Sequence, residues 1–117
     1  VIALPSRSAE LRKSLEHCQL IVNCTTLGMK YSPQERQSPL TADMIPRDAL
    51  VYDLVYNPLE PPLQRMAKER GAKVIGGLPM LVYQGAVSFK LWTGREPPLD
   101  IMFAAAERAL LRIGGNI

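Results

Sequence analysis

Short apolar segments alternate with helical ones along this chain, and this alternation limits its fold more than any other feature. Residues 20–24, 50–55 and 73–75 are predicted strands, and residues 1–4 form a further apolar run typical of a strand. The predicted helices cover residues 8–18, about 62–70, 80–92 and 99–113. Continuous apolar strands are typical of a sheet covered on both faces. The order of elements predicts an α/β domain with a mostly parallel sheet.

Candidate binding turns follow the three central strands directly. They are residues 25–28, 54–57 and 76–80. In open parallel sheets, ligands bind at the carboxyl ends of the strands. The placement of these turns therefore predicts one binding site at a single edge of the sheet.

The third turn opens the run of residues 76–86, which begins with Gly76 and Gly77 and continues as a mostly apolar helix carrying one amide, Gln84. Glycines after a strand allow a ligand to approach the backbone closely. An amide that looks buried on such a helix can orient a ligand with several hydroxyls. The alternative is a tight turn followed by a core glutamine bonded to a backbone carbonyl.

Composition excludes several classes of protein. The 117 residues are enough for one domain or part of one, and the net charge of +3 favours an anionic ligand such as a phosphorylated cofactor. Basic residues are scattered without an aromatic platform, so no nucleic-acid partner is expected. We see no apolar stretch of membrane-spanning length and no signal peptide, which predicts a cytoplasmic protein without a membrane partner.

The two cysteines, Cys18 and Cys24, fit no metal-ligand spacing. We expect reduced thiols, with Cys24 buried at the end of a strand, and no metal site.

Four motifs in order resemble the C-terminal half of shikimate dehydrogenases and the related quinate/shikimate dehydrogenases. They are residues 23–29 (NCTTLGM), 51–58 (VYDLVYNP), 76–86 (GGLPMLVYQGA) and 89–94 (FKLWTG), and the resemblance spans about residues 18–110. It implies a Rossmann-like, NADP-binding domain without its first βαβ unit. Residues 1–117 would be the C-terminal part of that domain, including the C-terminal helices, and the N-terminal substrate domain would lie outside the chain.

The resemblance also implies four cofactor-binding residues. Leu54 matches a position whose backbone lies near the nicotinamide end of NADP, and Gly77 matches a cofactor contact that needs no side chain. Thr25 would line the nicotinamide pocket. Met80 would pack against the nicotinamide ring or, alternatively, belong to the core.

Two further residues match substrate-binding positions in the same family. Tyr56 would contact the substrate across the cleft between domains, and Gln84 would bond a substrate hydroxyl. The substrate would be shikimate or 3-dehydroshikimate.

No catalytic residue is expected in this chain. The family's catalytic lysine and aspartate belong to the N-terminal domain, and no glycine-rich phosphate turn is present here. Asp53 is interpreted as a structural carboxylate satisfied by backbone or by a helix start. Arg7 is interpreted as a solvated arginine at a helix start rather than a phosphate contact.

The parent protein is thus expected to be an NADP-dependent oxidoreductase that reduces 3-dehydroshikimate to shikimate, while this chain alone is inactive. The alternative is a non-catalytic, truncated module that associates with itself or a partner through its exposed sheet. The motifs do not separate shikimate from quinate or NADP from NAD.

Overall fold

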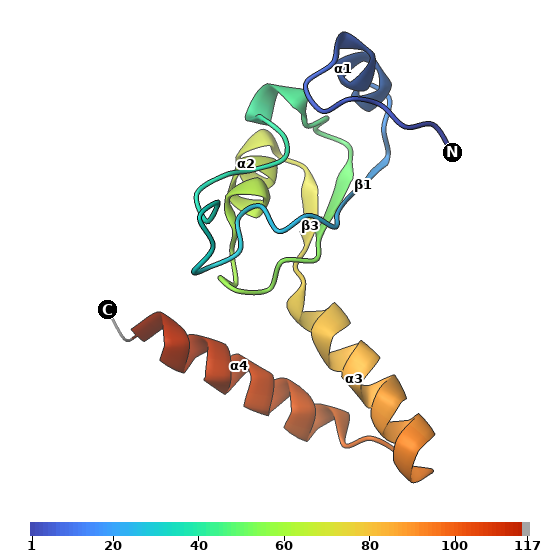
Figure 1. The fold of residues 1–117 in the computed structure, drawn as a ribbon, viewed down its shortest axis with the longest axis vertical. Coiled ribbons are helices and arrows are strands. Elements are labelled where there is room, and N and C mark those ends of the chain that lie inside the picture. Colours follow the sequence, from blue (N-terminus) through green and yellow to red (C-terminus); the bar gives the residue numbers. More distant parts are fainter. Residues whose placement is uncertain (116–117) are drawn as a thin grey trace.

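The computed structural model describes residues 1–115 and contains a three-stranded parallel sheet with helices (Figure 1). The strands β1 (Leu20–Asn23), β2 (Leu50–Asp53) and β3 (Lys73–Ile75) lie side by side in chain order. Asn23 pairs with Asp53 at the end of the β1–β2 ladder. The predicted α/β class and the three central strands are confirmed.

Capping residues mark the ends of the first helices. α1 (Ala9–Leu15) is capped by Ser8, whose hydroxyl oxygen accepts a hydrogen bond from the Leu11 amide at 3.1 Å. A short 3-10 helix, η1 (Ala42–Met44), precedes β2. α2 (Pro62–Arg70) starts with proline in its first turn and ends at Gly71, which adopts the left-handed conformation with φ of 86°.

Two longer helices form a V-shaped hairpin beyond the carboxyl edge of the sheet (Figure 1). α3 (Leu78–Thr93) ends at Gly94, and α4 (Leu99–Gly115) follows. The rings of Tyr83 and Phe103 hold the two helices together in an edge-to-face contact, with centroids 5.4 Å apart. Among the described residues, no helix is long and apolar enough to cross a membrane.

The core lies on one face of the sheet, where α2 packs on β2 and β3. α1 contributes Leu15 to this core, α2 contributes Leu63 and Ala67, and β2 contributes Val51. Its buried members are Leu15, Leu40, Met44, Ile45, Val51, Leu63, Ala67 and Ala72.

The opposite face of the sheet is open, which contradicts the expectation of cover on both faces. Leu20, Val22 and Ile75 remain 52%, 44% and 40% exposed. Side chains alternate along a strand, so the even-numbered residues of β1 face away from α2. Because α3 and α4 lead away from the sheet, neither helix covers this face in the described structure (Figure 1).

Of four local expectations, three were wrong, and the one for Arg7 was right. Cys24 is exposed rather than buried, because β1 ends at Asn23 and Cys24 already belongs to the turn. Residues 1–4 pair with no strand in the described chain and are exposed, so they lack the hydrogen bonds that define a strand. Arg7 lies exposed in the turn before α1, as expected of a helix-start residue. The last helix continues through Gly114 to Gly115 instead of ending before them.

Candidate functional site

The turns after β1 and β2 meet at the carboxyl edge of the sheet. The Lys30 amide donates a hydrogen bond to the Asn57 carbonyl at 2.7 Å, and the Leu54 amide donates to the Asn23 carbonyl at 3.1 Å. Gly28 has φ of 86°, and a Cβ there would lie 3.1 Å from Cδ of Pro62. The first turn therefore packs against the start of α2 and has little freedom to move.

Gly77 brings the turn after β3 against the turn after β2. A Cβ on Gly77 would lie 2.4 Å from the Leu54 carbonyl oxygen and 2.9 Å from the Val55 carbonyl carbon. The φ of Gly77 is −79°, so glycine is needed here for space and not for its dihedral angle. Two residues predicted to bind the cofactor are thus in contact, and the close approach at Gly77 is to the protein's own backbone.

A buried polar pair joins β1 to β2 directly below these turns. The Asn23 side-chain amide donates to Oδ1 of Asp53 at 2.9 Å, and both residues are almost fully buried. Each side chain also reaches forward into its own turn. Oδ1 of Asn23 accepts from the Thr25 amide at 3.0 Å, and Oδ1 of Asp53 accepts from the Val55 amide at 3.1 Å.

Burial raises the pKa of Asp53 above its usual value, and the hydrogen bonds from Val55 and Asn23 oppose that shift only in part. Its second oxygen, Oδ2, is buried and has no hydrogen-bond partner among the described residues. A carboxyl held by backbone and by a neighbouring strand agrees with the structural role expected from the sequence.

The remaining residues predicted on the turns lie at the same edge. Thr25 is exposed, and its hydroxyl donates to Oδ1 of Asn23 at 2.7 Å. Leu54, Tyr56 and Met80 are half-buried, Met80 in the first turn of α3. Apolar and hydroxyl groups that remain partly accessible beside a backbone junction can line one wall of a ligand site.

Gln84 differs from its prediction. Its side chain is exposed, because α3 projects beyond the sheet, and its amide donates to the Leu81 carbonyl at 2.9 Å. The alternative interpretation was a core glutamine bonded to a backbone carbonyl. Gln84 makes such a bond, but it does not lie in the core. A helical glutamine that the fold does bury is Gln64, which is 3% exposed on α2 and was not singled out from the sequence. Its place in the helical stripe between Leu63 and Ala67 could have revealed it.

Comparison with known proteins agrees with this geometry. Residues 77–107 match the family model of the shikimate 5'-dehydrogenase C-terminal domain. The NADP(+) shikimate dehydrogenase of Methanosarcina barkeri is 47% identical over 100 residues, which cover 86% of this chain and 35% of that protein. This chain matches the C-terminal portion of the shikimate dehydrogenase family.

Solved structures support the same match. A Thermus thermophilus shikimate 5-dehydrogenase in complex with NADP(H) and shikimate superposes with a TM-score of 0.76 at 44% identity, over 86% of this chain and 37% of that one. A Corynebacterium glutamicum quinate dehydrogenase in complex with NAD gives a TM-score of 0.77 at 27% identity, over 89% and 35% of the two chains. The chain spans about a third of the length of these relatives.

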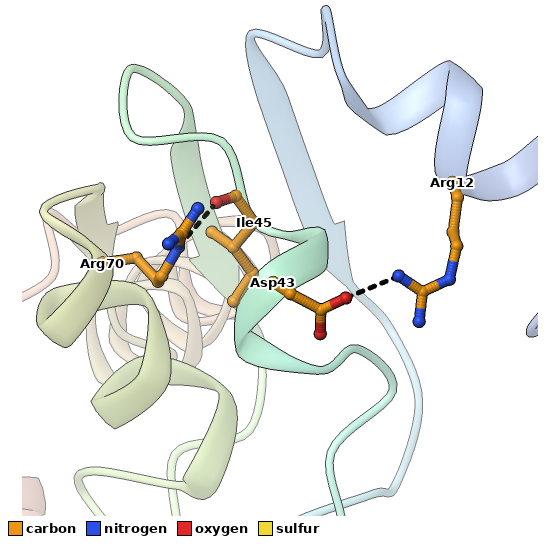
Figure 2. A network of polar contacts seen from close by, with 4 residues as sticks. All are labelled: Arg12, Asp43, Ile45 and Arg70. Carbon is orange, nitrogen blue, oxygen red and sulfur yellow. Dashed lines mark hydrogen bonds and ion pairs between the residues drawn. The ribbon is translucent and has the colours of Figure 1, made fainter.

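A hollow of about 300 Å³ lies elsewhere, among α1, η1 and the end of α2. Each of these segments comes just before a strand in the sequence, so the hollow lies toward the amino ends of the strands. Figure 2 shows its polar lining: Arg12 pairs with Asp43 at 2.5 Å, and Nε of Arg70 donates to the Ile45 carbonyl at 3.4 Å. Hydrogen bonds from Thr41 and Arg12 lower the pKa of Asp43 to about 2. These groups have partners within the protein, and the shikimate dehydrogenase motifs lie at the opposite edge.

No group of three or more histidine, cysteine, aspartate or glutamate residues in the described part of the chain could hold a metal ion. Lys68 and Lys90 form exposed ion pairs with Glu60 and Glu96, so neither offers a free ammonium group to the site.

Gly77→Ala tests the junction between the turns. The new methyl group would overlap the Leu54 carbonyl, so we expect a loss of about 1–3 kcal/mol of stability and weaker NADP binding in the full-length protein. Gly76→Ala is the matched control, because its Cβ would meet only the Gln64 side chain, at 3.4 Å. Urea unfolding and NADP titration measure both effects. Equal behaviour of the two variants would contradict the proposed role of Gly77.

Proposed function

We propose that this chain is the C-terminal part of the NADP-binding domain of a shikimate dehydrogenase, in which it holds the nicotinamide end of the cofactor and one wall of the substrate site. The parent protein would reduce 3-dehydroshikimate to shikimate with NADPH, as a cytoplasmic enzyme. The proposed part of the NADP-binding domain comprises residues 1–117.

The contact of Gly77 with the Leu54 carbonyl carries the proposal. It joins the turn after β2, which contains Leu54 and Tyr56, to the start of α3, which contains Met80. Two segments far apart in sequence therefore form one surface at the edge where parallel sheets bind ligands. The same segments carry the motifs shared with shikimate dehydrogenases.

The residues at this edge fit the nicotinamide end of NADP. Half-buried Leu54 and Met80 offer apolar surface to a flat ring, and the exposed Thr25 turn offers backbone and hydroxyl groups to an amide. When bound, the cofactor supplies the hydride. The protein around it orients the ring and excludes water from it, while Tyr56 and Gln84 face the substrate.

The proton relay would come from the N-terminal substrate domain, because no residue of this chain matches the family's catalytic lysine or aspartate. Asp53 is buried beneath the turns and is engaged by Asn23 and Val55, which supports its exclusion from the relay. The glycine-rich grip on the pyrophosphate also has no counterpart here.

Activity measured on two proteins tests this function. The full-length protein should consume NADPH with 3-dehydroshikimate, and parallel assays with quinate and with NAD decide the preferred substrate and cofactor. The 117-residue chain, purified free of host enzyme, should show no turnover and should bind NADP with a Kd on the order of millimolar or weaker, at most about 4 kcal/mol. A full-length protein inactive with 3-dehydroshikimate would overturn the proposal. Turnover or micromolar NADP binding by the short chain would contradict the assigned division of labour.

Gln84→Ala in the full-length protein should weaken substrate binding by about 0.5–1.5 kcal/mol, the value of one hydrogen bond to a neutral group. The NADP affinity should stay nearly unchanged, and stability should change by less than about 0.5 kcal/mol because the side chain is exposed. KM, kcat and melting temperature are measured together. Val87→Ala, on an exposed position of the same helix, is the control. Unchanged kinetics for Gln84→Ala would exclude the substrate contact.

The open face of the sheet favours a second candidate function, self-association of this chain. Leu20, Val22 and Ile75 form an apolar surface that is exposed to solvent in the isolated chain. β1 is also an edge strand of the sheet, the kind of strand to which another chain can pair.

Val22→Lys tests self-association of the 117-residue chain by analytical ultracentrifugation. The wild-type chain should form oligomers at micromolar concentration, and a lysine in the centre of the open face should return it to a monomer. Gln34→Lys adds the same charge on an exposed loop and should leave the oligomers intact. A monomeric wild-type chain, or oligomers that persist in Val22→Lys, would reject this surface.

A further inference from the structure

The buried Asn23–Asp53 pair lies at the one point where the two candidate ligand turns leave adjacent strands. The two residues are register partners in the β1–β2 ladder and are 3% and 0% exposed. Apolar residues would fill this space at lower desolvation cost, since buried polar groups are expensive unless they are hydrogen-bonded. A polar pair at the end of two strands therefore calls for a role beyond packing.

The hydrogen bonds of the pair run forward into the turns. Oδ1 of Asn23 accepts from both the amide and the hydroxyl of Thr25, at 3.0 and 2.7 Å. Oδ1 of Asp53 accepts from the Val55 amide at 3.1 Å and from the Asn23 side chain at 2.9 Å. One continuous chain of bonds thus connects Thr25 to Val55 through two side chains.

We propose that Asn23 and Asp53 are positioning residues that couple the turn after β1 to the turn after β2 and hold Thr25 and Leu54 at a fixed separation for the cofactor. This inference rests on the proposed binding of NADP at this edge. Neither side chain is expected to touch the cofactor, because both are buried beneath the turns. They act through Thr25 and through the backbone at 54–55, against which Gly77 is packed.

Asp53→Ala and Asp53→Asn in the full-length protein separate positioning from mere stability. Alanine removes both hydrogen bonds at Oδ1, so NADP affinity should fall about tenfold and exchange of the Thr25 and Val55 amide hydrogens should accelerate at least tenfold. Asparagine keeps an oxygen that can accept from Asn23 and Val55, so it should restore affinity and exchange protection to within about twofold of wild type.

Val51→Ala is the matched control for general loss of stability. Val51 is fully buried on the same strand and the same face, two residues before Asp53, and touches neither turn through a polar bond. It should lower the melting temperature while leaving NADP affinity and the exchange of the two amides unchanged. If Asp53→Ala does not fold, Asn23→Ala provides the same test from the other strand, since it frees only the turn after β1 and the Asp53 carboxyl.

The outcomes distinguish this inference from the proposed function. A wild-type protein that fails to bind NADP rejects the proposed function, while amide exchange still decides whether the pair couples the turns. NADP binding and amide exchange that are unaffected in Asp53→Ala or Asn23→Ala would overturn the positioning role and leave the proposed function standing. A loss of affinity in Val51→Ala as large as in Asp53→Ala would also overturn it, because stability alone would then explain the effect.

Discussion

Parallel pairing of three consecutive strands is the constraint on which the rest of this structure depends. The segments after β1 and β2 return the chain to the amino edge of the sheet, so all three carboxyl ends lie at one edge. The turns there come from positions about 25 residues apart in sequence and still touch. Gly77 packs against the Leu54 carbonyl, and this contact is possible only without a side chain. The candidate site is a consequence of this edge rather than of any single loop.

The polar pair below the turns also secures the ladder. Asn23 and Asp53 face each other in register on the buried side of β1 and β2. A slip of β1 by one residue against β2 would move Asn23 to the open face and break its bond to Asp53, because side chains alternate along a strand. An all-apolar ladder of four residues would specify its register less strongly. The same pair therefore ties the order of the sheet to the geometry of the turns.

In the described part of the chain, helices cover only one face of the sheet. α1, η1 and α2 cover the face that carries Val51, and the hairpin of α3 and α4 leaves the other face exposed (Figure 1). This chain covers 35–37% of the length of the relatives that it matches, and the matched parts share its fold. Apolar residues such as Val22 therefore remain exposed on the open face. The proposed self-association of this chain would cover them.

The local patterns determined the elements: the apolar strands, the proline start and glycine end of α2, and the glycine that ends α3 were all readable from sequence. The order of strands and helices likewise placed the turns at one edge, because short-range propensity and the rules of parallel connection suffice for that. Which amide is buried depends on which helix packs on the sheet. That is why Gln84 was expected inside and lies outside, while Gln64 is buried. The bond between Asn23 and Asp53, and the contact of Gly77 with Leu54, join residues 30 and 23 positions apart. Only the tertiary structure decided these contacts, since they depend on the register and proximity of separate strands, which no local sequence pattern encodes.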